Sequence, residues 1–188
     1  MDTLLSVMVG VGLAAACGFR VFVPLLVLSV AAQTGHMELA HGFAWLGSKP
    51  ATIAFGVATL IEIAGYYIPW VDHLLDVIAA PTAVVAGTLV TASSIGHASP
   101  FLHWSLALLA GGGTAAVFQG VTTAARGVST LTTGGFGNPV VSTVEAAGSA
   151  LLSVLAIAVP VLTVLALVLL LYFGVKRIAF RRRPVGAT

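Results

Sequence analysis

The sequence has very few charged residues and a single cysteine, and each scarcity excludes a class of protein. Only 7% of its 188 residues are Asp, Glu, Lys or Arg, whereas a soluble globular domain carries about 25%. Because every soluble fold leaves part of its surface in water, so apolar a chain does not fit that class. Cys17 is the only cysteine, so an intrachain disulfide and a cysteine-based zinc site are both excluded.

The sequence also lacks the common signatures of enzymes. It contains no HExxH motif, no phosphate-binding loop and no recognisable arrangement of nucleophile, histidine and acid. Gly10 and Gly12 match only a relaxed dinucleotide-binding pattern in the wrong context, and such small residues suit close helix packing in lipid instead. We therefore expect no enzyme activity, no cofactor and no metal site, and we interpret His36, Glu38 and His41 as surface residues of a loop.

The apolar residues form long segments that are typical of membrane-spanning helices. The chain is 59% hydrophobic, with a mean hydropathy of +1.08. A span needs about 20 apolar residues, and five segments reach that length: residues 4–32, 50–68, 74–92, 101–125 and 140–173. The sequence therefore predicts an all-α, polytopic transmembrane bundle of about five spans, or six if the first or last segment is two pieces.

Glycine and proline interrupt these segments. Gly18 and Pro24 flank Arg20 in the first segment, which leaves open a tilted helix, a kinked helix or two half-helices, and three glycines at residues 111–113 interrupt the fourth. Broken helices expose backbone polar groups, which a membrane tolerates only beside protein or a watery cavity. Two such places indicate a binding site near the middle of the bundle.

A pattern of similar residues occurs twice along the chain. A helix rich in small residues, an Arg, a loop with Gly and Pro, and a Glu-bearing helix follow one another around Arg20 and Glu62, and again around Arg126 and Glu145. Three spans precede the second copy, so the pattern predicts an inverted repeat, as in many transporters. The spacings differ between the copies, and chance resemblance remains an equally good explanation.

Positive charge is concentrated at the C-terminal end, in Lys176, Arg177, Arg181, Arg182 and Arg183. Positive residues next to a span mark the cytoplasmic side, and aromatic residues mark the interface. We therefore divide the chain into one transmembrane domain, residues 1–175, and a basic cytoplasmic tail, residues 176–188, and expect no nucleic-acid binding. With five spans the N-terminus lies outside and the loop at residues 33–49 inside; with six, the N-terminus lies inside.

Six ionisable residues within or beside the apolar segments are the candidate substrate-binding or ion-binding residues. They are Arg20, Glu62, Asp72, Asp76, Arg126 and Glu145. An ionised side chain at the bilayer centre costs about 3 kcal/mol on insertion scales. Such groups persist where they pair with each other, line a wet cavity or carry a function.

Arg20, Glu62 and Arg126 each have a functional and a structural interpretation. Arg20 offers a fork of donors to an anion, or it forms a structural pair with Glu62 or Glu145. Glu62 has no neutralising neighbour in the sequence, so we expect it to pair with an Arg from another helix or to remain protonated, as in a proton relay. Arg126 either joins the site or snorkels to the membrane surface.

The acidic pair and the aromatic residues before it lie at the junction of two segments. Asp72 and Asp76 are four residues apart and share one helix face. Asp72 either caps the third segment or joins Asp76 in a cation site. Tyr66, Tyr67 and Trp70 are typical of an aromatic belt at the interface.

Four blocks of sequence, residues 14–26, 42–48, 62–72 and 81–88, carry a resemblance to a known family. They resemble a family of small bacterial multi-pass membrane proteins classed as a domain of unknown function. The resemblance covers about residues 4–160 and leaves the basic tail outside. It implies a bacterial inner-membrane protein and brings no activity with it.

Two functions are compatible with these features. The first is a small-solute or ion transporter or channel, in which Arg20 and Arg126 attract an anion and Glu62 and Asp76 exchange protons. The second is a structural, assembly or lipid-contacting membrane module whose buried charges only join helices. The expected partners are the lipid bilayer, further copies of the chain, since so short a chain makes a narrow bundle, and an unidentified small solute or ion.

Overall fold

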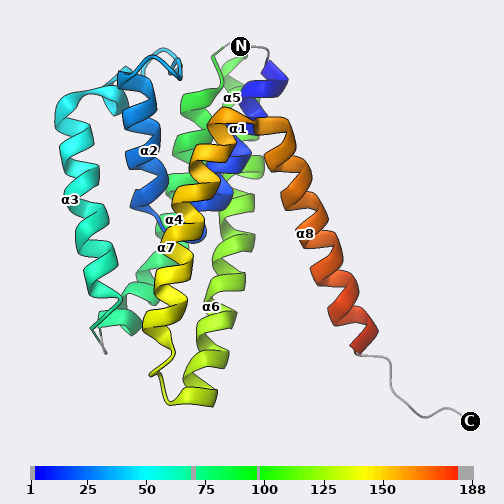
Figure 1. Cartoon of the computed structure of the whole chain (residues 1–188). Helices are drawn as coiled ribbons and strands as arrows, with labels where there is room; N and C mark the ends of the chain where they lie inside the picture. The colour runs from blue at the N-terminus through cyan, green and yellow to red at the C-terminus, as the bar shows by residue number, and fades with distance from the viewer. Residues whose placement is uncertain (1–2, 69–70, 97, 182–188) are drawn as a thin grey trace, which may run out of the picture.

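The computed structural model describes residues 3–68, 71–96 and 98–181, and within these ranges it contains helices and no strand (Figure 1). The elements in chain order are α1 (Thr3–Cys17), α2 (Phe22–Gln33), the short 3₁₀ helix η1 (Ala44–Gly47), α3 (Lys49–Gly65), α4 (Val71–Ser94), α5 (Pro100–Leu106), the π-helical segment η2 (Ala107–Gly112), α6 (Gly113–Thr133), α7 (Asn138–Ala158) and α8 (Pro160–Arg181). Trp70 of the expected belt and Arg182 and Arg183 of the basic tail lie outside the described residues.

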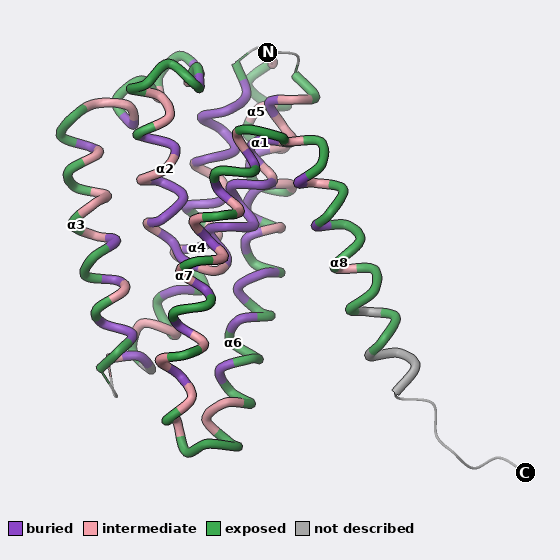
Figure 2. The backbone as a smooth tube through the Cα atoms, in the orientation of Figure 1, coloured by how far each residue is buried: buried purple, intermediate pink, exposed green. Residues whose placement is uncertain are grey.

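α1 lies at the centre of the bundle. It packs against α4, α6, α7 and α8, and the side chains and backbone around it form the most buried part of the molecule (Figure 2). Small residues make this possible: a Cβ atom at Gly10 would lie 2.8 Å from the Thr91 Cα, and one at Gly12 would lie 2.6 Å from the Ala156 Cβ. The glycines therefore let neighbouring backbones approach closely, as small residues do in membrane helices.

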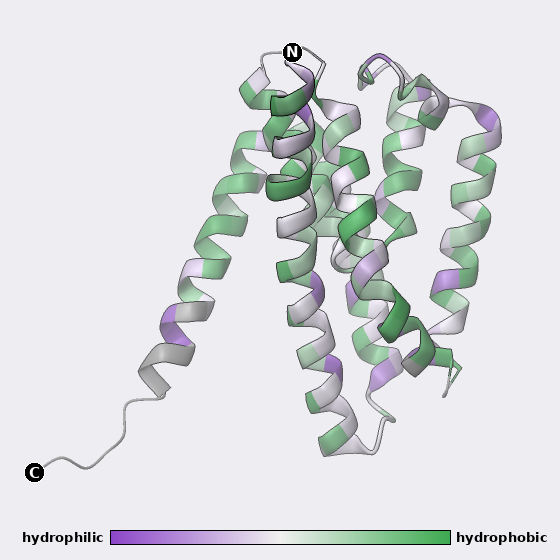
Figure 3. Ribbon diagram, turned by 180° about the vertical axis from the view of Figure 1, so that it is seen from behind, coloured by the Kyte–Doolittle hydropathy of each residue, from purple (hydrophilic) through white to green (hydrophobic). Residues whose placement is uncertain are grey.

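The outward faces of the helices are apolar, which identifies a membrane protein. Hydrophobic residues occur along all of the long helices (Figure 3), and many are exposed: Val77 and Leu109 are 75% and 76% exposed. Three helical stretches are long and apolar enough to cross a membrane: Leu74–Ser94, Pro100–Thr133 and Asn138–Ala158. This criterion of length and composition supports three spans, so the predicted count of five or six is not supported.

The first predicted segment is not one span but two half-helices, α1 and α2, which was one of the three open possibilities. The chain turns back at mid-height, so the start of α1 and the end of α2 lie at the same end of the bundle (Figure 1). At the turn, a Cβ atom on Gly18 would lie 2.5 Å from the Phe118 Cβ and 2.7 Å from the Ala115 oxygen. Only glycine fits there, because α6 passes directly against the turn.

Hydroxyl groups of neighbouring helices donate hydrogen bonds to backbone carbonyl groups at this turn. The Ser149 hydroxyl on α7 donates to the Ala16 oxygen at 2.9 Å, and the Thr122 hydroxyl on α6 donates to the Gly18 oxygen at 3.3 Å. A helix end buried in an apolar environment needs such partners. The helix break is therefore supported by side chains from two other helices.

The fourth and fifth predicted segments also differ from the sequence-based expectation. The glycines at 111–113 do not break a helix, since α5, η2 and α6 follow one another without a gap, and the stretch continues to Thr133. A Cβ atom on Gly111 would lie 2.5 Å from the Gly87 oxygen, so this glycine serves close packing against α4. The fifth segment is two helices, α7 and α8, because Val159 leaves the helical conformation (φ −141°, ψ 62°) before Pro160.

Candidate functional site

The six ionisable residues singled out from the sequence meet in one cluster, although they come from five different parts of the fold. Arg20 lies in the turn between α1 and α2, Glu62 on α3, Asp72 and Asp76 on α4, Arg126 on α6 and Glu145 on α7. Five of them are at most 7% exposed, and the side chain of Asp76 is 24% exposed. The cluster therefore lies inside the helical bundle.

Arg126 is the hub of the cluster. Its Nε donates to both carboxylate oxygens of Glu145, at 3.2 and 3.1 Å, and its Nη2 also donates to Glu145. Its Nη1 lies 3.0 Å from the Asp72 Oδ1 and 2.9 Å from the Asp76 Oδ1. Asn138 donates a further hydrogen bond to Asp72 at 2.9 Å. Arg126 is thus buried and paired, and the expectation that it might snorkel to the surface is wrong.

Arg20 is paired less completely than Arg126. Its Nη2 donates to the carbonyl oxygen of Ser142 at 3.0 Å and to the Ser142 hydroxyl, and it lies 3.3 Å from the Glu145 Oε2. Its Nε and Nη1 are buried and have no hydrogen-bond partner within the described structure. Of the two carboxylates expected to pair with Arg20, the structure therefore selects Glu145.

The aromatic ring of Tyr66 contacts both guanidinium groups. The Cζ atoms of Arg20 and Arg126 each lie 3.8 Å from the ring centroid, and Tyr66 is 5% exposed. A desolvated cation over an aromatic face is stabilised by about 2 kcal/mol. The ring thus attracts both cations, but the sequence placed Tyr66 in an interfacial belt. Its spacing of four residues from Glu62, on the same face of α3, was the available signal.

Glu62 binds backbone amides at the start of α2. Its Oε1 accepts the N–H of Val21 at 2.8 Å, and its Oε2 accepts the N–H of Phe22 at 3.1 Å. These two N–H groups are among the first of α2 and have no partner within that helix. Hydrogen bonds to backbone amides therefore replace the expected pairing of Glu62 with an arginine.

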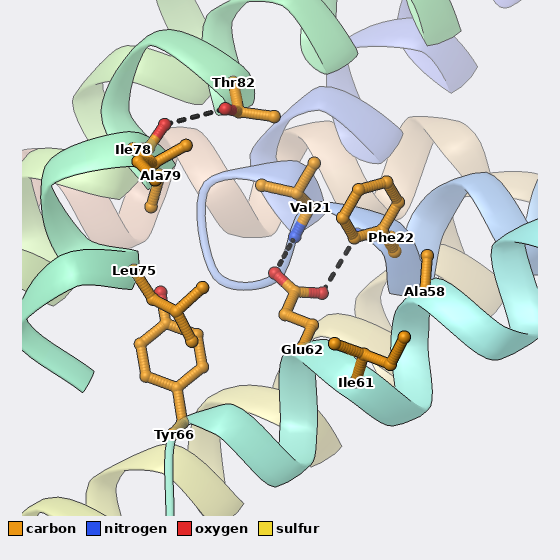
Figure 4. Close-up of a pocket in the computed structure, with 10 residues that line it drawn as sticks. All are labelled: Val21, Phe22, Ala58, Ile61, Glu62, Tyr66, Leu75, Ile78, Ala79 and Thr82. Atoms are coloured by element: carbon orange, nitrogen blue, oxygen red, sulfur yellow. Dashed lines mark hydrogen bonds between the residues drawn. The ribbon is translucent and has the colours of Figure 1, made fainter. Parts of the chain in front are cut away.

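Two cavities meet at Tyr66. The first, of about 220 Å³, is lined by Glu62, Tyr66 and mostly apolar side chains of α2, α3 and α4 (Figure 4). The second, of about 340 Å³, is lined by Tyr66, Asp72, Asn138 and the turn between α6 and α7. Tyr66 thus lines both an apolar cavity and a partly polar cavity.

The buried face of α7 is polar, which sequence analysis missed. Its buried residues include Asn138, Ser142, Glu145, Ser149 and Ser153, which recur every three or four residues. In a helix surrounded by lipid, a polar stripe at this spacing indicates a face turned toward the protein interior. Asn138 and Ser142 belong to the site through this stripe.

The arrangement gathers charges of both signs inside the bundle. Two guanidinium groups and four carboxylates lie in one buried network, where the charge of each group depends on its neighbours. Ionisable groups in such positions commonly form proton or ion pathways in membrane proteins. Within the described part of the chain, no group of three His, Cys, Asp or Glu residues is placed to hold a metal ion.

Comparison with known proteins identifies the family but no activity. No curated protein and no solved structure matches the chain. One family model matches residues 7–179, which is nearly the whole chain and includes every residue of the cluster. This match confirms the resemblance to an uncharacterised family. The chain therefore belongs to the family described as a domain of unknown function (DUF4126).

Proposed function

We propose that the protein is a small-solute or ion transporter or channel of the bacterial inner membrane, and that the buried cluster is its binding site. Three features support this proposal: a helix broken at mid-height, ionisable side chains from several helices gathered at the break, and two cavities that Tyr66 lines. Broken helices in transporters place backbone groups and charges at the substrate site in the same way.

The unpartnered nitrogens of Arg20 are the observation that carries the proposal. A buried donor without an acceptor costs about 1–3 kcal/mol, and more when it is charged. Structural pairs avoid this cost, as Arg126 does by meeting a carboxylate with each nitrogen. Arg20 instead keeps two buried donors unmatched beside Tyr66. A solute or a water molecule could supply the acceptor that these two donors lack.

The shape of the bundle supports a particular topology. The N-terminal end of α1 and the loop between α2 and α3 lie at one end, and the C-terminal end of α8 lies at the other (Figure 1). Lys176 and Arg177 near that end favour a cytoplasmic location for it. We infer that the N-terminus and the loop with Lys49 are both outside, so the hairpin of α1 and α2 re-enters from outside.

Cysteine labelling tests this topology. In a Cys17→Ala background, His41→Cys reports on the loop between α2 and α3, and Phe136→Cys reports on the turn between α6 and α7. We expect a membrane-impermeant maleimide to label the variant at position 41 in intact cells. The variant at position 136 should require permeabilised cells. Labelling of both positions from the same side, or of position 136 alone in intact cells, would contradict the outside location of the loop between α2 and α3.

Flux measurements on reconstituted protein test the transport function. Proteoliposomes with gradients of chloride, nitrate, sodium or potassium, and with an internal pH dye, should dissipate at least one gradient faster than protein-free vesicles. Arg177→Met, which changes an exposed arginine outside the cluster, serves as the matched control and should behave as the wild type. Leak at the protein-free rate for every gradient would contradict transport of these ions and protons.

The alternative function is a structural or assembly module, and the completeness of the Arg126 network favours it. A guanidinium that meets Glu145, Asp72 and Asp76 joins α4, α6 and α7 without any ligand. Under this alternative, substitutions in the cluster change stability and oligomer formation together, and no variant shows a defect in flux alone. In either case we expect the protein to work as a homo-oligomer.

A further inference from the structure

We propose that the N-terminal end of α2 is a binding site for a small monovalent anion and that Glu62 occupies this site until protonation releases it. The proposal names the substrate class and the regulation of the cluster, and it therefore rests on the proposed function. In this view, the Glu62 carboxylate is an internal substitute for the ligand.

The hydrogen bonds of Glu62 show what the site accepts. One carboxylate receives two consecutive backbone N–H groups, those of Val21 and Phe22, through its two oxygens. Helix N-termini bind anions with these same N–H groups, assisted by the helix dipole. No side chain of the N-cap residue Val21 closes the end of α2, so Glu62 from another helix does so. A planar anion of carboxylate size, such as nitrate, matches this geometry.

Arg20 is a second and independent indication of an anion. It directly precedes Val21, it is 1% exposed, and its Nε and Nη1 have no acceptor. Its guanidinium stacks on Tyr66, and this ring lines the same cavity as Glu62. The turn between α1 and α2 thus brings two backbone donors and an incompletely bonded cation together. Glu62 accepts hydrogen bonds from the two backbone donors and leaves the Nε and Nη1 of Arg20 without an acceptor.

The cavity beside Glu62 gives its side chain a place to move. The cavity of about 220 Å³ is lined by Glu62 itself and, from α4, by Leu75, Ile78, Ala79 and Thr82 (Figure 4). An apolar space accommodates a neutral carboxylic acid at low cost, but an ionised carboxylate at high cost. Protonation therefore weakens the bonds to the amides and makes the cavity accessible to the side chain. Acidification opens the site and neutral pH closes it.

The groups around Glu62 leave it as the residue whose charge controls the site. The charged or titratable groups that act on it are Arg20 from the turn, Arg126 from α6, Tyr66 from α3 and Cys17 from α1. None of the described side chains that α4 contributes to the cavity can titrate. The two guanidinium groups stay charged throughout the relevant pH range. Arg126 is already paired with Glu145, Asp72 and Asp76, so the cation that remains for an anion is Arg20, whose Nε and Nη1 have no acceptor.

Nitrate binding to the purified full-length chain tests the site without relying on transport. The thermal unfolding midpoint is measured at pH 5 and pH 7.5 with increasing nitrate, at constant ionic strength maintained with gluconate. We expect nitrate to stabilise the wild type at pH 5 and much less at pH 7.5. Glu62→Ala should bind nitrate equally at both values, and at pH 7.5 about tenfold more tightly than the wild type does, because no charged competitor remains.

Two further variants keep this test decisive. Glu62→Ala leaves two buried amides without a partner when the anion is absent; if it does not fold, Glu62→Gln replaces it, since an amide caps the helix but carries no charge at any pH. Nitrate binding to this variant should also lose its pH dependence. Glu38→Gln, at an exposed carboxylate of the loop between α2 and α3, should behave as the wild type.

The outcomes separate this inference from the proposed function. If nitrate stabilises the wild type and the Glu62 variants alike at both pH values, or stabilises none of them, the anion site is wrong, whatever the vesicles transport. If binding follows the expected pattern but vesicles show no flux, the site is correct and the transport function is wrong. Binding and acid-stimulated nitrate flux together support both.

Discussion

Replacing Arg126 with methionine is expected to lower the free energy of unfolding by about 3–5 kcal/mol, because it leaves buried carboxylates without their cation. Methionine has a similar length and fills most of the space of the arginine stem. Glu145 and Asp72 are at most 5% exposed, and the hydrogen bonds of Arg126 are the main compensation for their charge. Their mutual repulsion would add to the cost of burying them.

Denaturant titration of the purified protein in detergent measures this effect, with Arg177→Met as the control. Adding Asp72→Asn to Arg126→Met should recover part of the loss, since Asp72 pairs with Arg126 and its charge is uncompensated in the single variant. This recovery distinguishes lost charge pairing from lost packing, which Asp72→Asn would not restore. A stability of Arg126→Met within about 1 kcal/mol of the wild type, the usual limit for an exposed ion pair, would contradict the hub role of Arg126.

The membership of the cluster was predictable from sequence because charge in an apolar segment is rare and costly. Each of the six candidates stood out against apolar neighbours, and all six lie in the cluster. Their pairing was not predictable in the same way. The partner of Arg20 depends on the direction in which the chain turns at Gly18, and a single sequence left three conformations open there.

The groups that sequence analysis missed are those without charge. Tyr66 has the composition of an interfacial residue, and only its position on the Glu62 face of α3 indicates a place inside the bundle. The amides of Val21 and Phe22 carry no sequence signal, because every residue except proline presents the same N–H group there. Backbone sites of this kind become visible only when the helix break is known.

The predicted span count is not supported for a related reason. Hydropathy reports the total length of apolar chain, and residues 4–32 are long enough for one tilted helix. In the structure this length is divided between α1 and α2, and each half is shorter than a bilayer requires. Hydropathy likewise predicted one segment where the structure has two helices, α7 and α8, because Val159 and Pro160 are compatible with an apolar segment.

Replacing Arg20 with lysine is expected to reduce solute flux by more than about tenfold while costing far less stability than Arg126→Met does. Lysine keeps a positive charge near Glu145, but it lacks the planar fork that presents several donors in fixed directions. Loss of one charge-assisted hydrogen bond to a ligand corresponds to roughly this factor. A separation of flux from stability is the result that a purely structural arginine would not give.

An exchange of Arg20 and Glu145 is a poorer test, because Glu145 also pairs with Arg126. The exchange would place two guanidinium groups side by side and would destabilise the protein under either function. Arg20→Lys avoids this problem and is compared with Arg126→Lys, which should show the opposite balance: a large loss of stability, since five hydrogen bonds to carboxylates depend on the fork. If the two lysine variants lose flux only in proportion to stability, Arg20 is a structural residue like Arg126, and the cluster then serves to hold the helices together.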